Sequence, residues 1–173
     1  MLAAAGFDLM TGGSSGVMEA ASRGAHERGA HVIGVTLRRF EAGANRWVKE
    51  EIATDTFHER FNWLIGRPDG YIAMGGGMGT LTEICEVWQE QALGLMPRRP
   101  LVLVGPEWRA IFAILKRRLI AKPSHFEAIT IVDGIEEACA FVLQSFPALQ
   151  PARKRTRGLR SGMIESGKVR SEK

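Results

Sequence analysis

Short apolar runs alternate with amphipathic stretches along most of this chain of 173 residues. The apolar runs predict strands at residues 7–10, 31–36, 70–74, 101–104 and 129–132. The amphipathic stretches predict helices at residues 17–28, 57–67, 80–93, 108–121 and 135–146. Residues 37–56 are ambiguous, and a loop with a short strand is one interpretation of them. Strands that alternate with helices form parallel βαβ units, and uniformly apolar strands suit a sheet covered on both faces. We therefore predict an α/β protein with one doubly wound parallel sheet and helices on both of its faces.

Two glycine-rich segments each follow a predicted strand and precede a predicted helix. The first is Thr11-Gly-Gly-Ser-Ser-Gly16 and the second is Gly75-Gly-Gly-Met-Gly-Thr80. Glycines let the backbone turn sharply and approach a ligand, and the start of a helix favours an anion. Neither segment has the Walker A pattern or the dinucleotide pattern Gly-x-Gly-x-x-Gly. In one parallel sheet both would open on the crevice at the carboxyl ends of the strands, which favours a phosphate or nucleotide site over two plain turns.

Two charged residues near the second glycine segment each have two interpretations from spacing alone. Glu83 follows Thr80 by three residues, which is the pattern of a capping box in which Glu83 satisfies a free amide at the helix start. The alternative is that Thr80 contacts a phosphate while Glu83, one turn further on, faces the sugar. Arg60, on the preceding predicted helix, is either a surface arginine or a ligand contact. Spacing alone favours the capping and surface interpretations.

The positive net charge of +4 comes from the C-terminal segment. Residues 151–173 contain eight Lys and Arg against two Glu, a charge of +6, which leaves −2 for residues 1–150. We predict a nucleotide-binding domain over residues 1–148 and a basic, disordered tail over residues 149–173. A separate hypothesis is that this tail contacts nucleic acid or other polyanions, although the domain itself gives no sign of specific nucleic-acid binding.

Cysteine and histidine content argues against several classes of protein. Cys85 and Cys139 are too few for a disulfide framework, which favours the reducing cytoplasm. The four histidines have no metal-ligand spacing with these cysteines, so we predict no metal and no other cofactor. Residues 1–10 lack the features of a signal peptide, and no apolar stretch reaches the length of a membrane span. The expectation is a cytoplasmic protein that does not contact a membrane.

Both glycine segments resemble motifs of the LONELY GUY (LOG) family, also called lysine decarboxylase-like. Residues 11–25, a glycine loop followed by Val-Met-Glu-Ala and a helix of small residues, resemble its first motif. Residues 75–83 resemble its signature Pro-Gly-Gly-x-Gly-Thr-x-x-Glu. Arg60 lies fifteen positions before Gly75, the spacing at which the family places its arginine. The resemblance extends over roughly residues 5–145.

The resemblance implies a Rossmann-like domain that hydrolyses the N-glycosidic bond of nucleoside 5′-monophosphates to release the base and ribose 5-phosphate. Cytokinin ribotides or AMP would be the substrates, and Arg60 with Glu83 would be the catalytic pair. The nucleotide and its phosphate would be bound by residues of both segments, namely Gly12, Gly13, Gly16, Glu19, Gly76, Gly77, Gly79 and Thr80. The resemblance also implies a homodimer, and nothing indicates a pyridoxal-phosphate site.

The chain departs from the family pattern at several positions. Gly75, Phe61 and Leu64 stand where the family has proline, lysine and methionine. A triple glycine is typical of a neighbouring branch that includes molybdenum-cofactor carriers, so the alternative function is binding of a nucleotide or molybdenum cofactor without hydrolysis. The family also opens with a strand, a glycine-serine loop and a helix, whereas residues 2–6 resemble the end of that helix. We expect a fold that lacks this first βα unit, or a true start upstream.

Overall fold

The computed structural model describes residues 1–40 and 43–146, which form parallel strands that alternate with helices. The first half contains η1 (Ala3–Ala5), β1 (Leu9–Thr11), α1 (Val17–His26), β2 (Val32–Leu37), β3 (Glu50–Thr54) and α2 (Phe57–Gly66). The second half contains β4 (Tyr71–Ala73), α3 (Met78–Leu93), β5 (Leu101–Val104), α4 (Pro106–Arg118), η2 (Pro123–Ala128), β6 (Ile129–Val132) and α5 (Ile135–Ser145). The predicted α/β class is confirmed.

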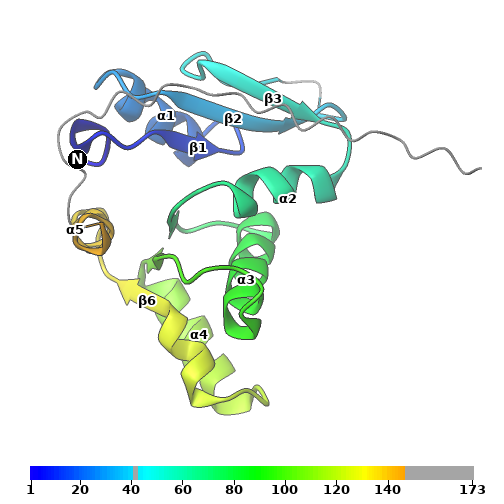
Figure 1. The fold of residues 1–173 in the computed structure, drawn as a ribbon, viewed down its shortest axis with the longest axis vertical. Helices are drawn as coiled ribbons and strands as arrows, with labels where there is room; N and C mark the ends of the chain where they lie inside the picture. The colour runs from blue at the N-terminus through cyan, green and yellow to red at the C-terminus, as the bar shows by residue number, and fades with distance from the viewer. Residues whose placement is uncertain (41–42, 147–173) are drawn as a thin grey trace, which may run out of the picture.

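The strands form two parallel sheets of three strands, whereas the sequence predicted a single sheet. Their orders are β1-β2-β3 and β4-β5-β6. In the first sheet Met10 lies opposite Ile33, and in the second Ile72 lies opposite Val102. Figure 1 shows the first sheet (blue to cyan) at one end of the molecule, with β6 and α4 (yellow to green) at the other. Alternation of strands and helices predicts parallel pairing but does not determine which strand edges meet, and in the described residues β1 and β4 are separate edges.

The apolar core follows this division. One cluster packs α3, β5 and α4 together through Trp88, Leu103 and Phe112, and a smaller one packs α1 against β2. A third cluster, around Val102 and Val142, also receives Phe7 from the segment before β1. The ring of Phe7 meets that of Phe146 edge to face at 5.5 Å between centroids. Side-chain packing of this kind therefore joins the two halves.

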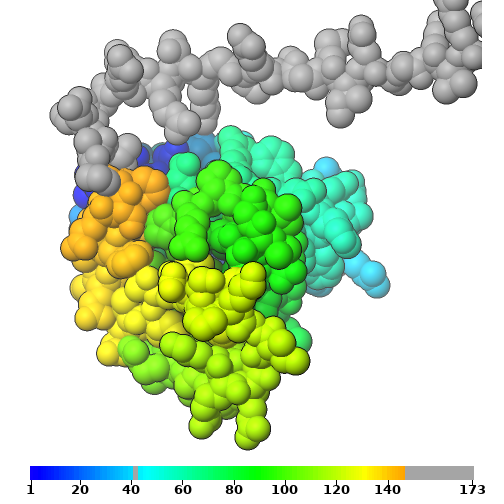
Figure 2. Space-filling model, turned by 60° about the horizontal axis from the view of Figure 1, so that its bottom comes forward, coloured from blue at the N-terminus to red at the C-terminus, as the bar shows by residue number. Residues whose placement is uncertain are grey.

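Strand β2 is buried along its whole length, which agrees with the prediction of a strand covered on both faces. Strand β3 lies within residues 37–56, the ambiguous stretch for which a loop with a short strand is one interpretation of the sequence. Figure 2 shows the face formed by α3, α4 and η2 (green to yellow), with α5 (orange) at its side. No helix among the described residues has the length and apolarity to cross a membrane. The predicted tail, residues 149–173, lies outside the described residues.

Candidate functional site

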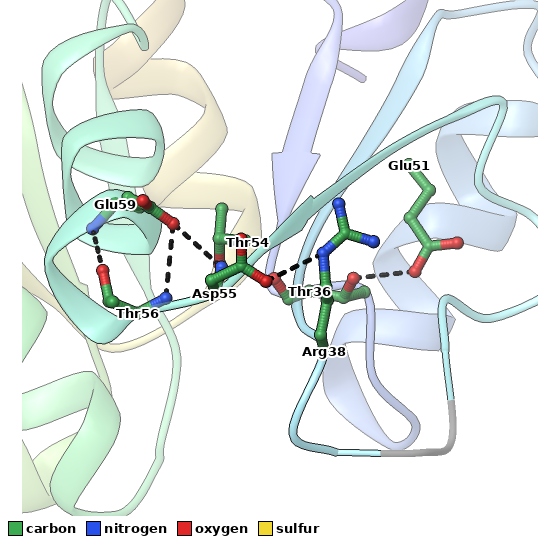
Figure 3. Close-up of polar contacts among 7 residues, drawn as sticks. All are labelled: Thr36, Arg38, Glu51, Thr54, Asp55, Thr56 and Glu59. Atoms are coloured by element: carbon green, nitrogen blue, oxygen red, sulfur yellow. Dashed lines mark hydrogen bonds and ion pairs between the residues drawn. The ribbon is translucent and has the colours of Figure 1, made fainter.

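Helix α2 is anchored where the chain leaves β3 (Figure 3). Thr56 Oγ1 accepts a hydrogen bond from the Glu59 amide at 3.2 Å, and Glu59 Oε2 accepts one from the Thr56 amide at 3.3 Å. This is a capping box, which satisfies free amides at both positions. Thr54 Oγ1 also donates to the Thr36 carbonyl at 2.7 Å, so the end of β3 is tied to β2 just before the helix. These contacts fix the helix that carries Arg60.

Arg60 extends from α2 across the end of the first sheet. Its Nε donates to the Val35 carbonyl of β2 at 2.9 Å, and its side chain is only 14% exposed. The interpretation of Arg60 as a surface arginine is therefore wrong. The guanidinium also lies against the first glycine segment, because a Cβ placed on Gly12 would overlap Arg60 Nη2. A side chain at position 12 and the observed position of Arg60 exclude each other.

Glu83 faces Arg60 from α3. Its Oε1 lies 3.7 Å from Arg60 Nη1, and its side chain is 32% exposed. Helix α3 begins at Met78 with Gly77 as its N-cap, two residues before the predicted start, so Glu83 lies in the second turn. The capping-box interpretation of Glu83 is therefore wrong. Burial raises the pKa of Glu83 above its ordinary value, and the nearby Arg60 offsets this only in part.

The second glycine segment forms the turn between β4 and α3. A Cβ on Gly76 would overlap Thr80 Oγ1, so the backbone at Gly76 lies directly against the threonine. Gly76, Gly77 and Gly79 are exposed, and Thr80 is half-buried. The first amides of a helix have no partner within the helix and carry its positive dipole end. This segment therefore presents accessible backbone donors a little over one turn before Glu83.

The first glycine segment turns sharply between β1 and α1. Gly13 has φ +75° and is buried against Thr36 and Gly34 of β2, and its amide donates to Thr11 Oγ1 at 3.1 Å. Gly16, with φ +71°, precedes α1, and Glu19 lies half-buried in the first turn of that helix. Such φ values favour glycine over other residues. Among the predicted site residues, Gly12, Arg60 and Glu83 lie together in the structure. Gly76 and Thr80 form a second contact.

Sequence reasoning missed two parts of this arrangement. The capping box at Thr56 and Glu59 has the same Thr-x-x-Glu signature that was assigned to Thr80 and Glu83. Asn45, which contacts the first glycine segment, lies in the ambiguous stretch of residues 37–56 and carried no functional signal in the sequence. Within the described residues no group of three or more His, Cys, Asp or Glu is arranged to hold a metal ion.

These features define a Rossmann-like α/β protein in which an arginine and a carboxylate meet beside the first glycine-rich turn, while the second glycine-rich turn begins the helix that carries the carboxylate. The family described as "Possible lysine decarboxylase" matches residues 18–142, and the chain belongs to this family, the LOG family. The cytokinin riboside 5′-monophosphate phosphoribohydrolase of Mycobacterium tuberculosis is 30% identical over 146 residues, which cover 79% of this chain and 77% of that protein.

Two solved structures share the fold. The molybdenum cofactor binding protein of the phototrophic bacterium Rippkaea orientalis has a TM-score of 0.66 and 26% identity, with 83% of this chain and 80% of that chain covered. The molybdenum cofactor carrier protein of Chlamydomonas reinhardtii has a TM-score of 0.63 and 28% identity, with the same coverage. The chain thus resembles an enzyme in sequence, and a molybdenum cofactor binding protein and a molybdenum cofactor carrier protein in structure.

Proposed function

We propose that this protein is a nucleoside 5′-monophosphate phosphoribohydrolase that acts on AMP or a cytokinin ribotide. The observation that carries the proposal is the approach of Arg60 to Glu83 beside Gly12, at 3.7 Å between Nη1 and Oε1. The phosphoribohydrolase named for the Mycobacterium tuberculosis relative supports the same reaction.

In this reaction the oxygen of a water molecule forms a bond to C1′ of the ribose while the C1′–N bond breaks. The water gives up one proton, and the departing base gains one. Positive charge develops on the ribose ring as the bond to the base breaks, as in other glycoside cleavage. The ionised carboxylate of Glu83 stabilises that charge or accepts the proton of the attacking water.

Arg60 has a separate task in this proposal. A carboxylate and a nucleotide phosphate in one site repel each other, and a fixed guanidinium offsets that repulsion. The bond from Arg60 Nε to the Val35 carbonyl holds the guanidinium in place without using its terminal nitrogens. Those nitrogens stay directed toward Gly12 and Glu83.

The phosphate of the nucleotide is assigned in this proposal to the backbone amides from Gly76 to Thr80. Gly12, Gly13, Gly16 and Glu19 complete the nucleotide site from the other sheet. Backbone amides at the start of a helix are well suited to an anion, since the helix dipole adds to their hydrogen bonds. The exposure of Gly76, Gly77 and Gly79 leaves this backbone open to a ligand.

The test is incubation of the purified protein with AMP, followed by chromatography for adenine and ribose 5-phosphate. We expect both products in equal amounts, and their absence in a parallel reaction with Glu83→Gln, which controls for a contaminating hydrolase. Intact nucleotide after prolonged incubation of the folded wild-type protein with AMP and, in a second reaction, with a cytokinin ribotide would reject the proposal.

The second candidate function is that of a carrier which binds a nucleotide or the molybdenum cofactor without turnover. The likeness to two molybdenum cofactor proteins and the triple glycine at residues 75–77 favour it. The same incubation separates the two candidates. Saturable binding of AMP or molybdenum cofactor with no release of adenine favours the carrier.

A further inference from the structure

Asn45 folds back from the loop between β2 and β3 onto the first glycine segment. Its backbone amide donates to the Gly13 carbonyl at 2.7 Å. Its side-chain Nδ2 donates to the same carbonyl at 3.0 Å and to the Ser14 carbonyl at 3.1 Å. The other side-chain atom, Oδ1, accepts a hydrogen bond from the Trp47 amide at 3.2 Å, which fixes the orientation of the amide group. One side chain thus binds two consecutive carbonyls of the segment.

Binding these carbonyls also determines where the next amides point. In a trans peptide the C=O and the following N–H point in opposite directions, and the described chain has no cis peptide bond. Because the Gly13 and Ser14 carbonyls face Asn45, the amides of Ser14 and Ser15 face away from it. Gly13 is buried against β2, whereas Ser14 and Ser15 are exposed. The two amides therefore belong to the accessible part of the turn that leads into α1.

An asparagine suits this task better than its close analogues. It supplies donors for the carbonyls and an acceptor for the Trp47 amide from one planar group. Aspartate would keep the acceptor but would place a negative charge against two carbonyl oxygens. Alanine would keep the backbone bonds with Gly13 and Val48 but lose the side-chain bonds, including the weaker one from Nδ2 to Ser22 Oγ at 3.5 Å, which leaves the Ser14 carbonyl without its partner.

We propose that Asn45 is a positioning residue that orients the Ser14 and Ser15 amides toward one oxygen of the nucleotide phosphate, whose other oxygens are assigned to the amides from Gly76 to Thr80. The inference rests on the proposed function in that the ligand is a nucleoside monophosphate, but it concerns binding and does not depend on hydrolysis. Asn45 acts through the glycine segment and not through contact with the reacting atoms.

The experiment is calorimetric titration of the full chain with AMP and with adenosine, for wild type, Asn45→Ala and Asn45→Asp. Hydrogen bonds to charged groups are among the stronger ones, so we expect AMP affinity to fall by about tenfold or more in both variants, most in Asn45→Asp. Adenosine, which has no phosphate, should bind all three proteins within about twofold of one another, because no charged contact is lost. Asn62→Asp is the matched control, since it makes the same change at an exposed position of α2 and should leave both affinities unchanged.

Several outcomes would overturn the inference. A variant that loses AMP and adenosine affinity in equal proportion would make Asn45 merely structural, as would unchanged AMP affinity in a folded Asn45→Asp protein. If Asn45→Asp does not fold, Asn45→Ala decides, because it retains the backbone bond to Gly13. A wild-type protein that binds AMP no better than adenosine also rejects the inference. AMP binding without adenine release would reject the proposed hydrolysis alone, and the titrations would still test Asn45.

Discussion

Arg60 and Glu83 come from helices that follow different sheets, and their side chains meet at 3.7 Å. Arg60 is bound to β2 of the first sheet through the Val35 carbonyl, whereas Glu83 lies on α3, directly after β4 of the second. The distance exceeds that of a tight bidentate pair, so each group retains capacity for a ligand. A ligand at this pair would contact both halves of the protein.

Glu83→Gln should abolish hydrolysis while leaving the protein folded. Glutamine keeps the shape of the side chain but removes the charge that, in the proposed reaction, stabilises the ribosyl cation. We expect the turnover of AMP to fall by about a hundredfold to ten-thousandfold. The melting temperature should stay near that of wild type, since Glu83 does not cap α3. Wild-type turnover in the folded variant would remove Glu83 from the site.

The pH dependence of activity should reflect the raised pKa of Glu83. The proposed reaction needs the ionised carboxylate of Glu83, and burial raises the pKa of this group. The acid limb of the kcat/KM profile should therefore lie above the ordinary range for a glutamate, and should move if Arg60 is replaced by Ala. A profile that falls only below pH 4 would contradict this assignment.

The same shift has a consequence for stability with a defined sign. The folded protein holds the Glu83 proton more tightly than the unfolded chain does. The stability from the protonated form is present below the unfolded pKa and is lost as pH rises through the folded pKa. As pH rises from the unfolded pKa to the folded pKa of Glu83, the stability of wild type should therefore fall relative to that of Glu83→Gln. Melting curves of both proteins at several pH values measure this difference. If the difference in melting temperature between wild type and Glu83→Gln did not change with pH, the burial of Glu83 would be incomplete in solution.

Gly12→Ala should impair catalysis because its Cβ overlaps the Arg60 guanidinium. Displacement of Arg60 by about 1 Å from its productive position should lower kcat/KM by about a hundredfold. Gly24→Ala is the matched control, since Gly24 lies within α1 and a Cβ there meets nothing within 4 Å. It should leave activity unchanged and stabilise the protein by about 0.5–1 kcal/mol. Equal kinetics for the two variants would argue against the close approach of Arg60.

Thr56→Ala should lower stability with little effect on turnover. It removes one half of the capping box of α2, a loss of about 0.5–2 kcal/mol that chemical denaturation can measure. Arg60 keeps its bond to the Val35 carbonyl, so the reacting groups stay in place. Thr82→Ala, at an exposed position of α3, serves as the control and should not destabilise the protein. A large loss of turnover in Thr56→Ala would mean that the cap also positions the site.

The sequence predicted the elements of this fold better than their assembly. The spacing of apolar residues that marks a strand or a helix is a local property of the sequence. Strands β2 and β5 are apolar enough to be predicted without knowledge of the strands that pair with them. The division into two sheets depends on contacts between distant edges, for which residues 9–11 and 71–73 carry no separate signal. Thr56 and Thr80 have the same spacing to a glutamate, and only the three-dimensional turn at Gly76 and Gly77 shows that α3 begins before Thr80. The contact of Asn45 with Gly13 spans 32 residues and has no sequence period.

Because β1 and β4 are separate edges, no backbone ladder links the two sheets within the described residues, and side-chain contacts such as that of Phe7 with Phe146 join them. Regions of a protein open with different free energies, and the weakest boundary opens first. On heating, we expect the junction at which Arg60 meets Glu83 to open while both hydrogen-bonded ladders persist. The proposed hydrolysis should then be lost at a lower temperature than the far-ultraviolet circular dichroism signal. A nucleotide bound across the junction should bring these two temperatures closer together, because it binds only the closed state.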